Sequence, residues 1–597
     1  MAQEGSSSKV MLKKQKIDPL LIFIVCLAVI SYGRIYFLYD IVWDDNCWLL
    51  AAYTSSNLDQ FLNTGFYELR RVPMGTFLYY LLSLHKATNH AYLIWHAINI
   101  IVQVLTPLFL YLFLKNLFKE RQALSFFIAV SFITFPLDYT LPYLAVMSYR
   151  IAIMLTLISL YLTVKAFAKD NPKYLLFLIA LLIAGVSYYI FMEASVVFEP
   201  ARLFIIGYVF YKKGTERELL VKKAVIYWLP FFILCIPLVL YKLIVKPYGI
   251  YEGVYKADFF FFLKWGEHKK IIKILLLHQW KVLLRYLSDV KILSIVLSVF
   301  SVIFSFLMLK KIFTIFKIEK ETDSAAFTAT KEGGPKDKLR FSIIVLIMGI
   351  ICLIPQVLLI EFAGRETGYG MNSSHFIPLQ IGYSIIIGLF LYHLYIFWNL
   401  YISKSWLNLI LSLILGAGVF FNNLNLDTYL KSWEKQLKFW QAFTDRFPSL
   451  PEKAVFMMDV SDHYFFDATD LDNSYDLEFI LNLLYANSDK PEDFRRYKVL
   501  ALEEFKPEMA DRFRCNQVNE ERLERVTHFG KDALNPCEFI IVYYRDGKLM
   551  VNREIKKMFP DIPYREWLNS DFPVLPDKPV AYPLRYKLNG FLDDNAL

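Results

Sequence analysis

The sequence predicts a polytopic α-helical membrane protein of about eleven transmembrane helices, with a C-terminal α/β domain outside the membrane. Of its 597 residues, 56% are hydrophobic and only 20% are charged, and the mean hydropathy is +0.38. The apolar residues form continuous runs, many of them near the 20 or so residues of helix that cross a bilayer core. This composition excludes a soluble multidomain enzyme, a disordered chain and a small disulfide-stapled secreted domain.

The transmembrane helices are expected at the apolar runs. These runs are continuous rather than alternating, which favours helices over a β-barrel. The first run is too internal and too long for a cleaved signal peptide. The expected spans are residues 18–39, 90–114, 122–136, 145–165, 174–190, 195–211, 224–245, 290–310, 341–360, 377–400 and 406–423.

The distribution of Lys and Arg among the loops predicts a cytoplasmic N-terminus and an extracytoplasmic C-terminal domain. Every loop expected on the N-terminal side is basic. On the opposite side, the loops at 136–144 and 190–195 hold no Lys or Arg, and the loop at 361–376 holds only Arg365. The membrane itself is either a plasma or inner membrane or that of the endoplasmic reticulum.

One expected outer loop, 246–289, is basic and departs from this rule. Its apolar residues recur at helical spacing, which indicates an amphipathic helix on the outer membrane surface. The positive charge of this helix either contacts anionic lipid or attracts a phosphate-bearing substrate. The apolar positions are Ile271, Ile272, Leu275 and Leu276.

The chain divides into a transmembrane domain, residues 1–425, with a large first outer loop at 40–89, and an extracytoplasmic α/β domain, residues 426–597. In the second domain, short apolar segments within a charged, mixed sequence predict strands at Ala454–Val460, Tyr497–Leu502 and Phe539–Tyr544. Helices are expected at Tyr475–Tyr485 and Glu520–Arg525. Cys515 and Cys537 lie in this polar region. The sequence is equally consistent with a disulfide between them and with two free thiols.

Several catalytic motifs are absent from the sequence. It holds no phosphate-binding Gly-rich loop followed by Lys and Ser or Thr, no HExxH, no Cys-x-x-Cys and no Gly-x-Ser-x-Gly. A nucleotide-driven pump and a zinc protease are therefore excluded. Any chemistry is expected to use carboxylates and cations at the outer ends of the spans.

The first outer loop holds two adjacent carboxylates, Asp44 and Asp45, between Trp43 and Trp48. One alternative is that they cap the helix that follows them, since an Asp there satisfies backbone N–H groups and favours the helix dipole. The other is that one of them is a catalytic base.

An arginine pair, Arg70 and Arg71, follows in the same loop, just before Pro73. These side chains either extend to lipid headgroups or bind a phosphate through the guanidinium fork.

These features, followed by a second span that carries His96 and Asn99, resemble the GT-C glycosyltransferases. The closer resemblance is to the branch of protein O-mannosyltransferases and lipid-A aminoarabinose transferases, and it covers roughly residues 18–425. FPLDYT at 135–140 with SYRIA at 148–152 is similar to the family's Pro-x-x-Thr…Gly-Arg turn. MEA at 192–194 lies where members often have Lys-Glu. SSHFIP at 373–378 resembles Ser-Arg-Tyr-x-x-Pro, with His375 in place of the Arg.

The resemblance implies an inverting glycosyltransferase that takes a sugar from a polyprenyl-phosphate carrier to a protein, glycan or lipid acceptor on the outer side. Its catalytic base corresponds to Asp44 or Asp45, and Asp44 is preferred because it lies closer to the span. Some relatives use a divalent metal, but a metal is not favoured here, because the sequence shows no outer carboxylate cluster beyond Asp44 and Asp45. No other cofactor and no nucleic acid is expected. The residues expected to bind the donor phosphate or substrate are Arg70, Arg71, Arg150, Glu193, Arg365 and His375.

Glu193 is expected to face a cavity or to pair with Arg150 or Arg202, because a carboxylate near a span end is unfavourable against lipid. Two other functional classes stay open. One is a transporter or flippase for a polyprenyl-linked glycan, although no internal repeat is visible and the candidate charges gather at span ends. The other is a non-catalytic scaffold derived from the GT-C fold, which the replacement of Arg by His375 keeps in consideration.

Overall fold

The computed structural model describes most of the helical part of the chain and the core of the C-terminal sheet. The residues described are 18–37, 44–66, 72–88, 91–119, 121–143, 146–244, 269, 271–273, 275–277, 286–329, 335–362, 370–450, 454–460, 474–486, 492, 495–501, 523–527, 530–534, 539–545 and 547–551. Cys515 and Cys537, for which a disulfide and two thiols were both left open, lie outside them.

The protein is a polytopic α-helical membrane protein, as predicted. Within the described ranges, ten helical stretches are long and apolar enough to cross a membrane. They are built from α1 (Pro19–Tyr32) with η1 (Gly33–Phe37), α5 (Ala91–Leu117), α7 (Met147–Phe167), α8 (Tyr174–Val186) with η3 (Ser187–Phe191), η4 (Glu193–Phe198) with α9 (Glu199–Lys212), α10 (Arg217–Ile244), α12 (Ile292–Ala329), α13 (Pro335–Phe362), η8 (Gly370–Leu379) with α14 (Gln380–Tyr401), and α15 (Lys404–Arg446).

The third expected span corresponds to a shorter helix, α6 (Gln122–Thr134). Its 13 residues rise only about 20 Å, and every residue after the first is buried. Glycines in α14 and α15 let these two helices approach the backbone of α6 closely. A Cβ added to Gly388 of α14 would lie 2.4 Å from the Cα of Ile128, and one added to Gly418 of α15 would lie 2.4 Å from the Cβ of Thr134. Helix α6 is therefore the packed centre of the bundle.

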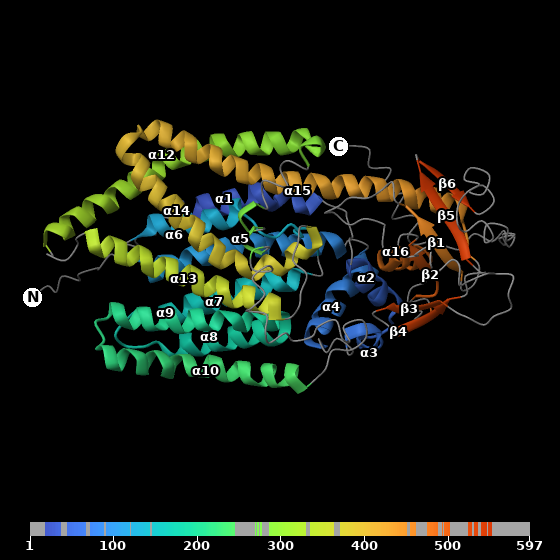
Figure 1. The fold of residues 1–597 in the computed structure, drawn as a ribbon, viewed down its shortest axis with the longest axis horizontal. Coiled ribbons are helices and arrows are strands. Elements are labelled where there is room, and N and C mark those ends of the chain that lie inside the picture. The colour runs from blue at the N-terminus through green and yellow to red at the C-terminus, as the bar shows by residue number, and fades with distance from the viewer. Residues whose placement is uncertain are drawn as a thin grey trace, which may run out of the picture.

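Contacts along α1 fix the two ends of the bundle. At one end, Asp18 accepts from Lys115 at the end of α5 (2.5 Å). At the other, the Tyr32 hydroxyl donates to the carbonyl of Ile133 in α6 (3.2 Å). From that second end α15 continues to the C-terminal sheet (Figure 1), so we call it the sheet end and the first one the far end.

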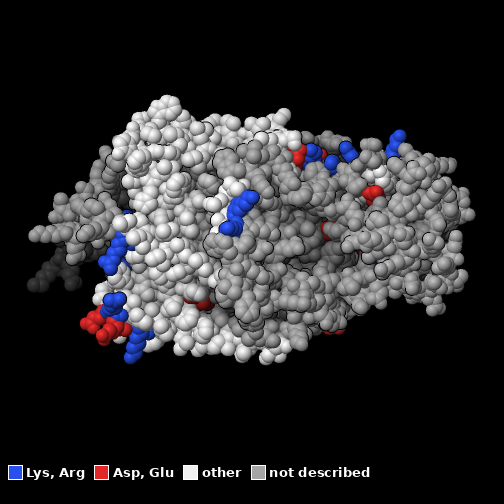
Figure 2. Space-filling view, in the orientation of Figure 1, with Lys and Arg blue, Asp and Glu red and all other residues white. Residues whose placement is uncertain are grey.

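The side of the bundle is mostly uncharged. On the face drawn in Figure 2, most of the described surface carries neither basic nor acidic side chains, and many charged side chains gather near the far end. Two of the loops expected to be basic meet there, because Lys213 after α9 donates to the carbonyl of Lys169 after α7.

The first outer loop folds into helices α2 (Asp44–Thr54), α3 (Leu58–Phe61) and α4 (Val72–Thr88), with the short helix η2 (Leu62–Phe66) after α3. These helices lie at the sheet end, between the bundle and the C-terminal sheet (Figure 1). The short helix η7 (Leu287–Asp289) precedes α12 at the same end.

The C-terminal sheet has the strand order β2-β1-β5-β6, in which β1 is parallel to β2 and β5, and β6 is antiparallel to β5. Its strands are β1 (Val455–Asp459), β2 (Lys498–Ala501), β5 (Phe539–Arg545) and β6 (Lys548–Val551). Helix α16 (Ser474–Tyr485) connects β1 to β2. Aromatic residues near the end of α15, Phe439 and Phe443 among them, pack into the core of this sheet.

Helix α15 is continuous over 43 residues, so the domain boundary predicted at 425/426 falls inside it. Strands β1, β2 and β5 lie in the three segments predicted as strands, and β5 extends one residue further. Helix α16 begins one residue before the predicted helix. The helix predicted at Glu520–Arg525 is wrong, because β3 (Leu523–Thr527) pairs antiparallel with β4 (Gly530–Leu534) there. A helix of six residues has too few internal hydrogen bonds to compete with this ladder.

Candidate functional site

The connection between α6 and α7 is irregular backbone held on several sides at the sheet end. The N–H of Leu137 donates to Oε1 of Gln380 (2.6 Å), and the N–H of Tyr139 donates to Oγ of Ser373 (2.8 Å). The carbonyl of Tyr139 accepts from Nδ2 of Asn425 in α15 (3.0 Å). Irregular backbone inside a membrane bundle is stable only where protein groups or water satisfy it. Side chains of α14, α15 and η8 provide those partners here.

A buried ion pair fixes the same connection to α7. Arg150, near the start of α7, is 3% exposed and donates from Nε to Oδ2 of Asp138 (2.8 Å). The other carboxylate oxygen, Oδ1, accepts from the N–H (2.8 Å) and the hydroxyl of Thr140. The remaining hydrogen bonds of Arg150 go to Oδ1 of Asn99 (3.3 Å), Oγ1 of Thr140 (3.1 Å) and the carbonyls of Leu141 (3.2 Å), Tyr143 (3.1 Å) and Thr140.

All the nitrogens of the Arg150 guanidinium, which together carry five N–H groups, therefore have acceptors within the protein. A substrate phosphate would have to displace these contacts to bind there. The arrangement makes Arg150 a brace of the connection, rather than the phosphate ligand that the resemblance implied.

Both arginines suggested as partners of Glu193 form ion pairs with other carboxylates. Arg150 pairs with Asp138, and Arg202 donates from Nε to Oε1 of Glu199 (2.9 Å) inside α9. The side chain of Glu193 lies outside the described part of the chain.

The Glu199–Arg202 pair is fully inside the bundle, with both residues at most 2% exposed. Oε1 of Glu199 also accepts from the Tyr188 hydroxyl, and Arg202 donates to Oγ of Ser159 and Oγ1 of Thr163 (3.0 Å each). Within the described residues, Oε2 of Glu199 and Nη2 of Arg202 have no hydrogen-bond partner.

The segment that contains His375 forms η8 and lies against the α6–α7 connection. Besides the Ser373–Tyr139 hydrogen bond, Phe376 is fully buried in one cluster with Leu137. His375 itself is half-buried. Two sequence segments that carry the GT-C resemblance, about 235 residues apart, thus meet directly.

The predicted amphipathic segment packs against the same place. Its described residues within 269–277 are helical. Ile271 (2% exposed) and Leu275 (8%) join the cluster of Phe376 and Leu137, whereas Ile272 (51%) and Leu276 (66%) are exposed. One apolar face therefore contacts protein and the other faces outward.

Helix α2 begins at Asp44, so Asp44 and Asp45 lie in its first turn. This position fits both a capping role and a catalytic one, and their side chains lie outside the described residues. Further along α2, Leu50 is buried in one cluster with Met147 and Ile151 of α7. Helix α2 therefore lies at the sheet end, in the same apolar cluster as the start of the helix that carries Arg150.

The same cluster includes Phe479, Leu483 and Ala486 at α16, so α2 lies between α7 and the C-terminal sheet domain. Of the other predicted site residues, Arg70, Arg71 and Arg365 lie outside the described residues. In the ranges that the structure covers, no group of three or more His, Cys, Asp and Glu is arranged to hold a metal ion.

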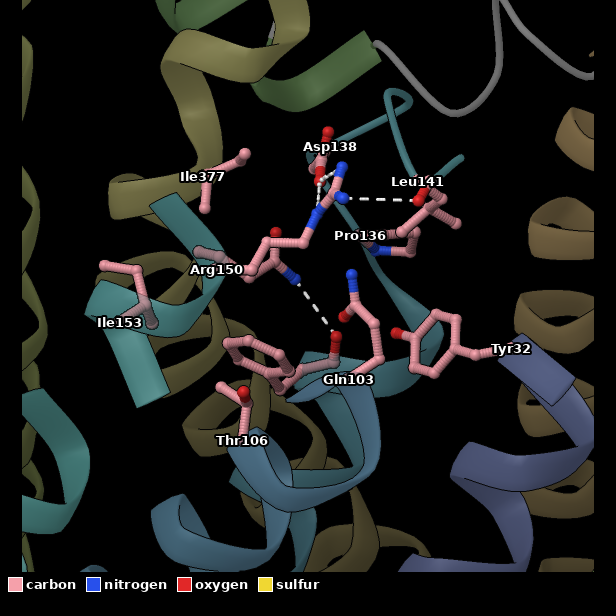
Figure 3. A pocket seen from close by; sticks show the side chains of 11 residues that line it. Tyr32, Gln103, Thr106, Pro136, Asp138, Leu141, Arg150, Ile153 and Ile377 are labelled. Atoms are coloured by element: carbon pink, nitrogen blue, oxygen red, sulfur yellow. Dashed lines mark hydrogen bonds and ion pairs between the residues drawn. The ribbon is translucent and has the colours of Figure 1, made fainter. Parts of the chain in front are cut away.

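A small pocket lies behind the α6–α7 connection, beside the Asp138–Arg150 pair (Figure 3). Its volume of about 30 Å³ has room for roughly two water molecules. It is therefore too small for a sugar ring, and the donor sugar does not belong in it. The lining residues are Tyr32, Gln103, Thr106, Phe132, Pro136, Asp138, Leu141, Arg150, Ile153, Ile377 and Gln380.

A third buried ion pair, which the sequence did not predict, ties α15 to η1 at the sheet end. Arg34 donates to Oδ1 of Asp427 (2.5 Å) and to Oγ of Ser294 in α12 (2.7 Å). Asp427 is fully buried, and its Oδ2 accepts from Ser294 (2.6 Å) and from the N–H of Lys291 (2.9 Å). In the sequence, each partner was marked only as a charged residue close to the end of an apolar run.

Comparisons with known proteins add no neighbour from which a function could be carried over. No family model matches the chain, and neither the curated proteins nor the solved structures gave a match.

Proposed function

We propose that the chain is an integral-membrane, inverting glycosyltransferase of the GT-C type. It would move a sugar from a polyprenyl-phosphate carrier to an acceptor on the extracytoplasmic side, with Asp44 or Asp45 as general base. In this proposal the sheet end is extracytoplasmic and the far end is cytoplasmic, as the positive-inside rule predicts.

One observation carries the proposal: the segments of the resemblance converge at one end of the bundle. The α6–α7 connection, the start of α7 and the Ser373 segment share one hydrogen-bonded network through Asp138, Arg150 and Tyr139. Helix α2, with the acidic pair in its first turn, shares an apolar cluster with that α7 terminus. These segments are far apart in the sequence, and their meeting supports a common site.

The chemistry assigned to this site is a single displacement. The base takes the proton of the acceptor hydroxyl or amide, and the acceptor atom forms a bond to the anomeric carbon. The bond from that carbon to the carrier phosphate oxygen breaks, and its electron pair leaves with the lipid phosphate. Cations must stabilise this leaving charge.

Two of the cationic groups proposed for the carrier phosphate, His375 and Lys273, belong to or pack beside the Ser373 segment. His375 belongs to η8, and the basic segment at 269–277 packs on its neighbour Phe376. Lys273 of that segment is exposed. Arg70, Arg71 and Arg365 complete the set from the sequence. Asp138 and Arg150 are proposed as positioning residues.

A transporter for a polyprenyl-linked glycan is the second candidate, and the Glu199–Arg202 pair favours it. Ionisable residues inside a membrane bundle often mark transport pathways. However, Arg202 also stacks on Phe231, with its Cζ 4.0 Å from the ring centroid, and bonds two hydroxyls of α7. These contacts are typical of a structural pair.

The test is to supply membranes containing the full chain with a panel of radiolabelled polyprenyl-phosphate sugars and candidate acceptors. A glycosyltransferase releases the carrier phosphate and gives a product of inverted anomeric configuration. Movement of intact carrier-linked sugar across the bilayer, with no new glycosidic bond, would instead establish the transporter.

A further inference from the structure

The pocket beside the Asp138–Arg150 pair is lined by a side-chain amide that has no hydrogen bond to the described residues. Gln103 of α5 is 7% exposed and lines the pocket, and no described residue hydrogen-bonds its side chain. Figure 3 shows its amide pointing into the space between Tyr32 and Arg150. An amide offers two N–H donors and one carbonyl acceptor, and leaving these unpaired in a buried site is unfavourable.

The other polar groups of the pocket have acceptor capacity left. The Tyr32 hydroxyl donates to the carbonyl of Ile133 (3.2 Å), and the Thr106 hydroxyl donates to the carbonyl of Val102 (2.6 Å). Each hydroxyl oxygen can still accept a hydrogen bond. By contrast, the amide of Gln380 is occupied by three backbone groups.

Size and charge determine what can occupy this space. About 30 Å³ admits roughly two water molecules and nothing as large as a sugar or a phosphate. Asp138 and Arg150, the charged groups in the lining, neutralise each other through their ion pair, so the lining selects a neutral occupant. A water molecule needs two to four polar partners, and the pocket offers them.

We propose that this pocket is an internal water site, in which one or two ordered water molecules bridge the Gln103 amide to the hydroxyls of Tyr32 and Thr106. The site belongs to the core formed by α1, α5, α6, α7 and α14, and it does not depend on the proposed enzymatic activity. Water at this position also makes the surroundings of the buried ion pair more polar, which lowers its desolvation penalty.

A pair of matched substitutions tests the proposal through the sign of its effect. Gln103→Met keeps the size of the side chain and removes its amide. If water bridges the amide, the substitution removes a partner and lowers the melting temperature of the full chain in detergent, by about 2 °C. If the pocket is dry, the substitution removes an unsatisfied amide, and the melting temperature stays equal or rises, which would overturn the proposal.

Gln356 of α13 is the control. It is 1% exposed, its Nε2 has no partner among the described residues, and it does not line the pocket. We therefore expect Gln356→Met to leave the melting temperature equal or higher.

A density map of the wild-type chain at about 2 Å resolution gives a test that does not depend on how the variants fold. A peak within hydrogen-bonding distance of the Gln103 amide and the Tyr32 hydroxyl is the expected result. A map without such a peak would overturn the water site.

Discussion

Arg150 and Asp138 form an ion pair with a nitrogen–oxygen distance of 2.8 Å between the start of α7 and the chain that leads into it. Their side chains are 3% and 10% exposed, so the pair is held away from solvent. The same guanidinium bonds three backbone carbonyls of the α6–α7 connection. This one side chain therefore sets the path of the segment on which the proposed site depends.

Breaking this pair on one side should destabilise the protein strongly. In Arg150→Met, the Asp138 carboxylate loses its cationic partner and three carbonyls each lose one donor, and removal of one partner of a buried pair costs about 3–5 kcal/mol. The free energy of unfolding of the detergent-purified chain measures the effect. The exposed pair Lys291–Glu434, with side chains 38% and 57% exposed, provides the control, and Lys291→Gln should change stability by less than about 0.5 kcal/mol. Equal effects from both variants would contradict the bracing role.

The Arg34–Asp427 pair should behave as a coupled unit. Asp427→Leu alone leaves the Arg34 guanidinium buried without its carboxylate, and we expect a loss of about 3–5 kcal/mol in the free energy of unfolding. The double variant Arg34→Met with Asp427→Leu removes both charges and should recover a large part of that loss. A double-mutant cycle measures the coupling, and additive effects would show that the two charges do not interact.

Close packing around α6 predicts opposite outcomes for two glycines. A Cβ at Gly418 would lie 2.4 Å from the Cβ and 2.6 Å from the carbonyl oxygen of Thr134, so Gly418→Ala should lower the free energy of unfolding by about 1–3 kcal/mol. At Gly207 in α9, the nearest atom to an added Cβ is the Cβ of Ala224 at 3.8 Å. Gly207→Ala should be neutral or stabilising by up to about 1 kcal/mol. A stable Gly418→Ala variant would mean that α15 packs less closely on α6.

Helix α16 presents adjacent leucines to different partners. Leu483 is buried in the cluster of α2 and α7, whereas Leu484 is buried in the core of the C-terminal sheet. Leu483→Ala should therefore speed amide hydrogen exchange in α2, while Leu484→Ala should speed it mainly in the sheet, each with a stability loss of about 2–5 kcal/mol. If both variants changed α2 equally, α16 would not act as a separate support for that helix.

Hydropathy and strand patterns were sufficient to predict the architecture, because they are local properties of the chain. The apolar runs became the spans, and the short apolar segments at 455–459 and 539–545 became strands. The third apolar run became α6, which is shorter than a bilayer crossing and buried on all sides. Its close packing against Gly388 and Gly418 joins segments that are distant in the sequence, and no pattern within the run encodes that packing.

The site was predicted only in part, because its contacts join distant segments. The sequence pointed to Arg150, Glu193 and the Ser373–His375 segment, yet the carboxylate partner of Arg150 is Asp138. The Arg34–Asp427 contact spans 393 positions, and such a pairing has no local signature. A single sequence cannot rank the several carboxylates that each arginine could reach.

The most direct test of the central claim, an active site at the start of α2, is sugar transfer by Asp44→Asn, Asp45→Asn and the control Asp59→Asn at equal protein level. Asp59 is an exposed carboxylate of α3 in the same loop, so its substitution should leave transfer unchanged. We expect one of the other two variants to lose at least about 100-fold in rate, because general-base catalysis contributes that much or more. Full transfer by both Asp44→Asn and Asp45→Asn would contradict the claim and leave the acidic pair as a helix cap.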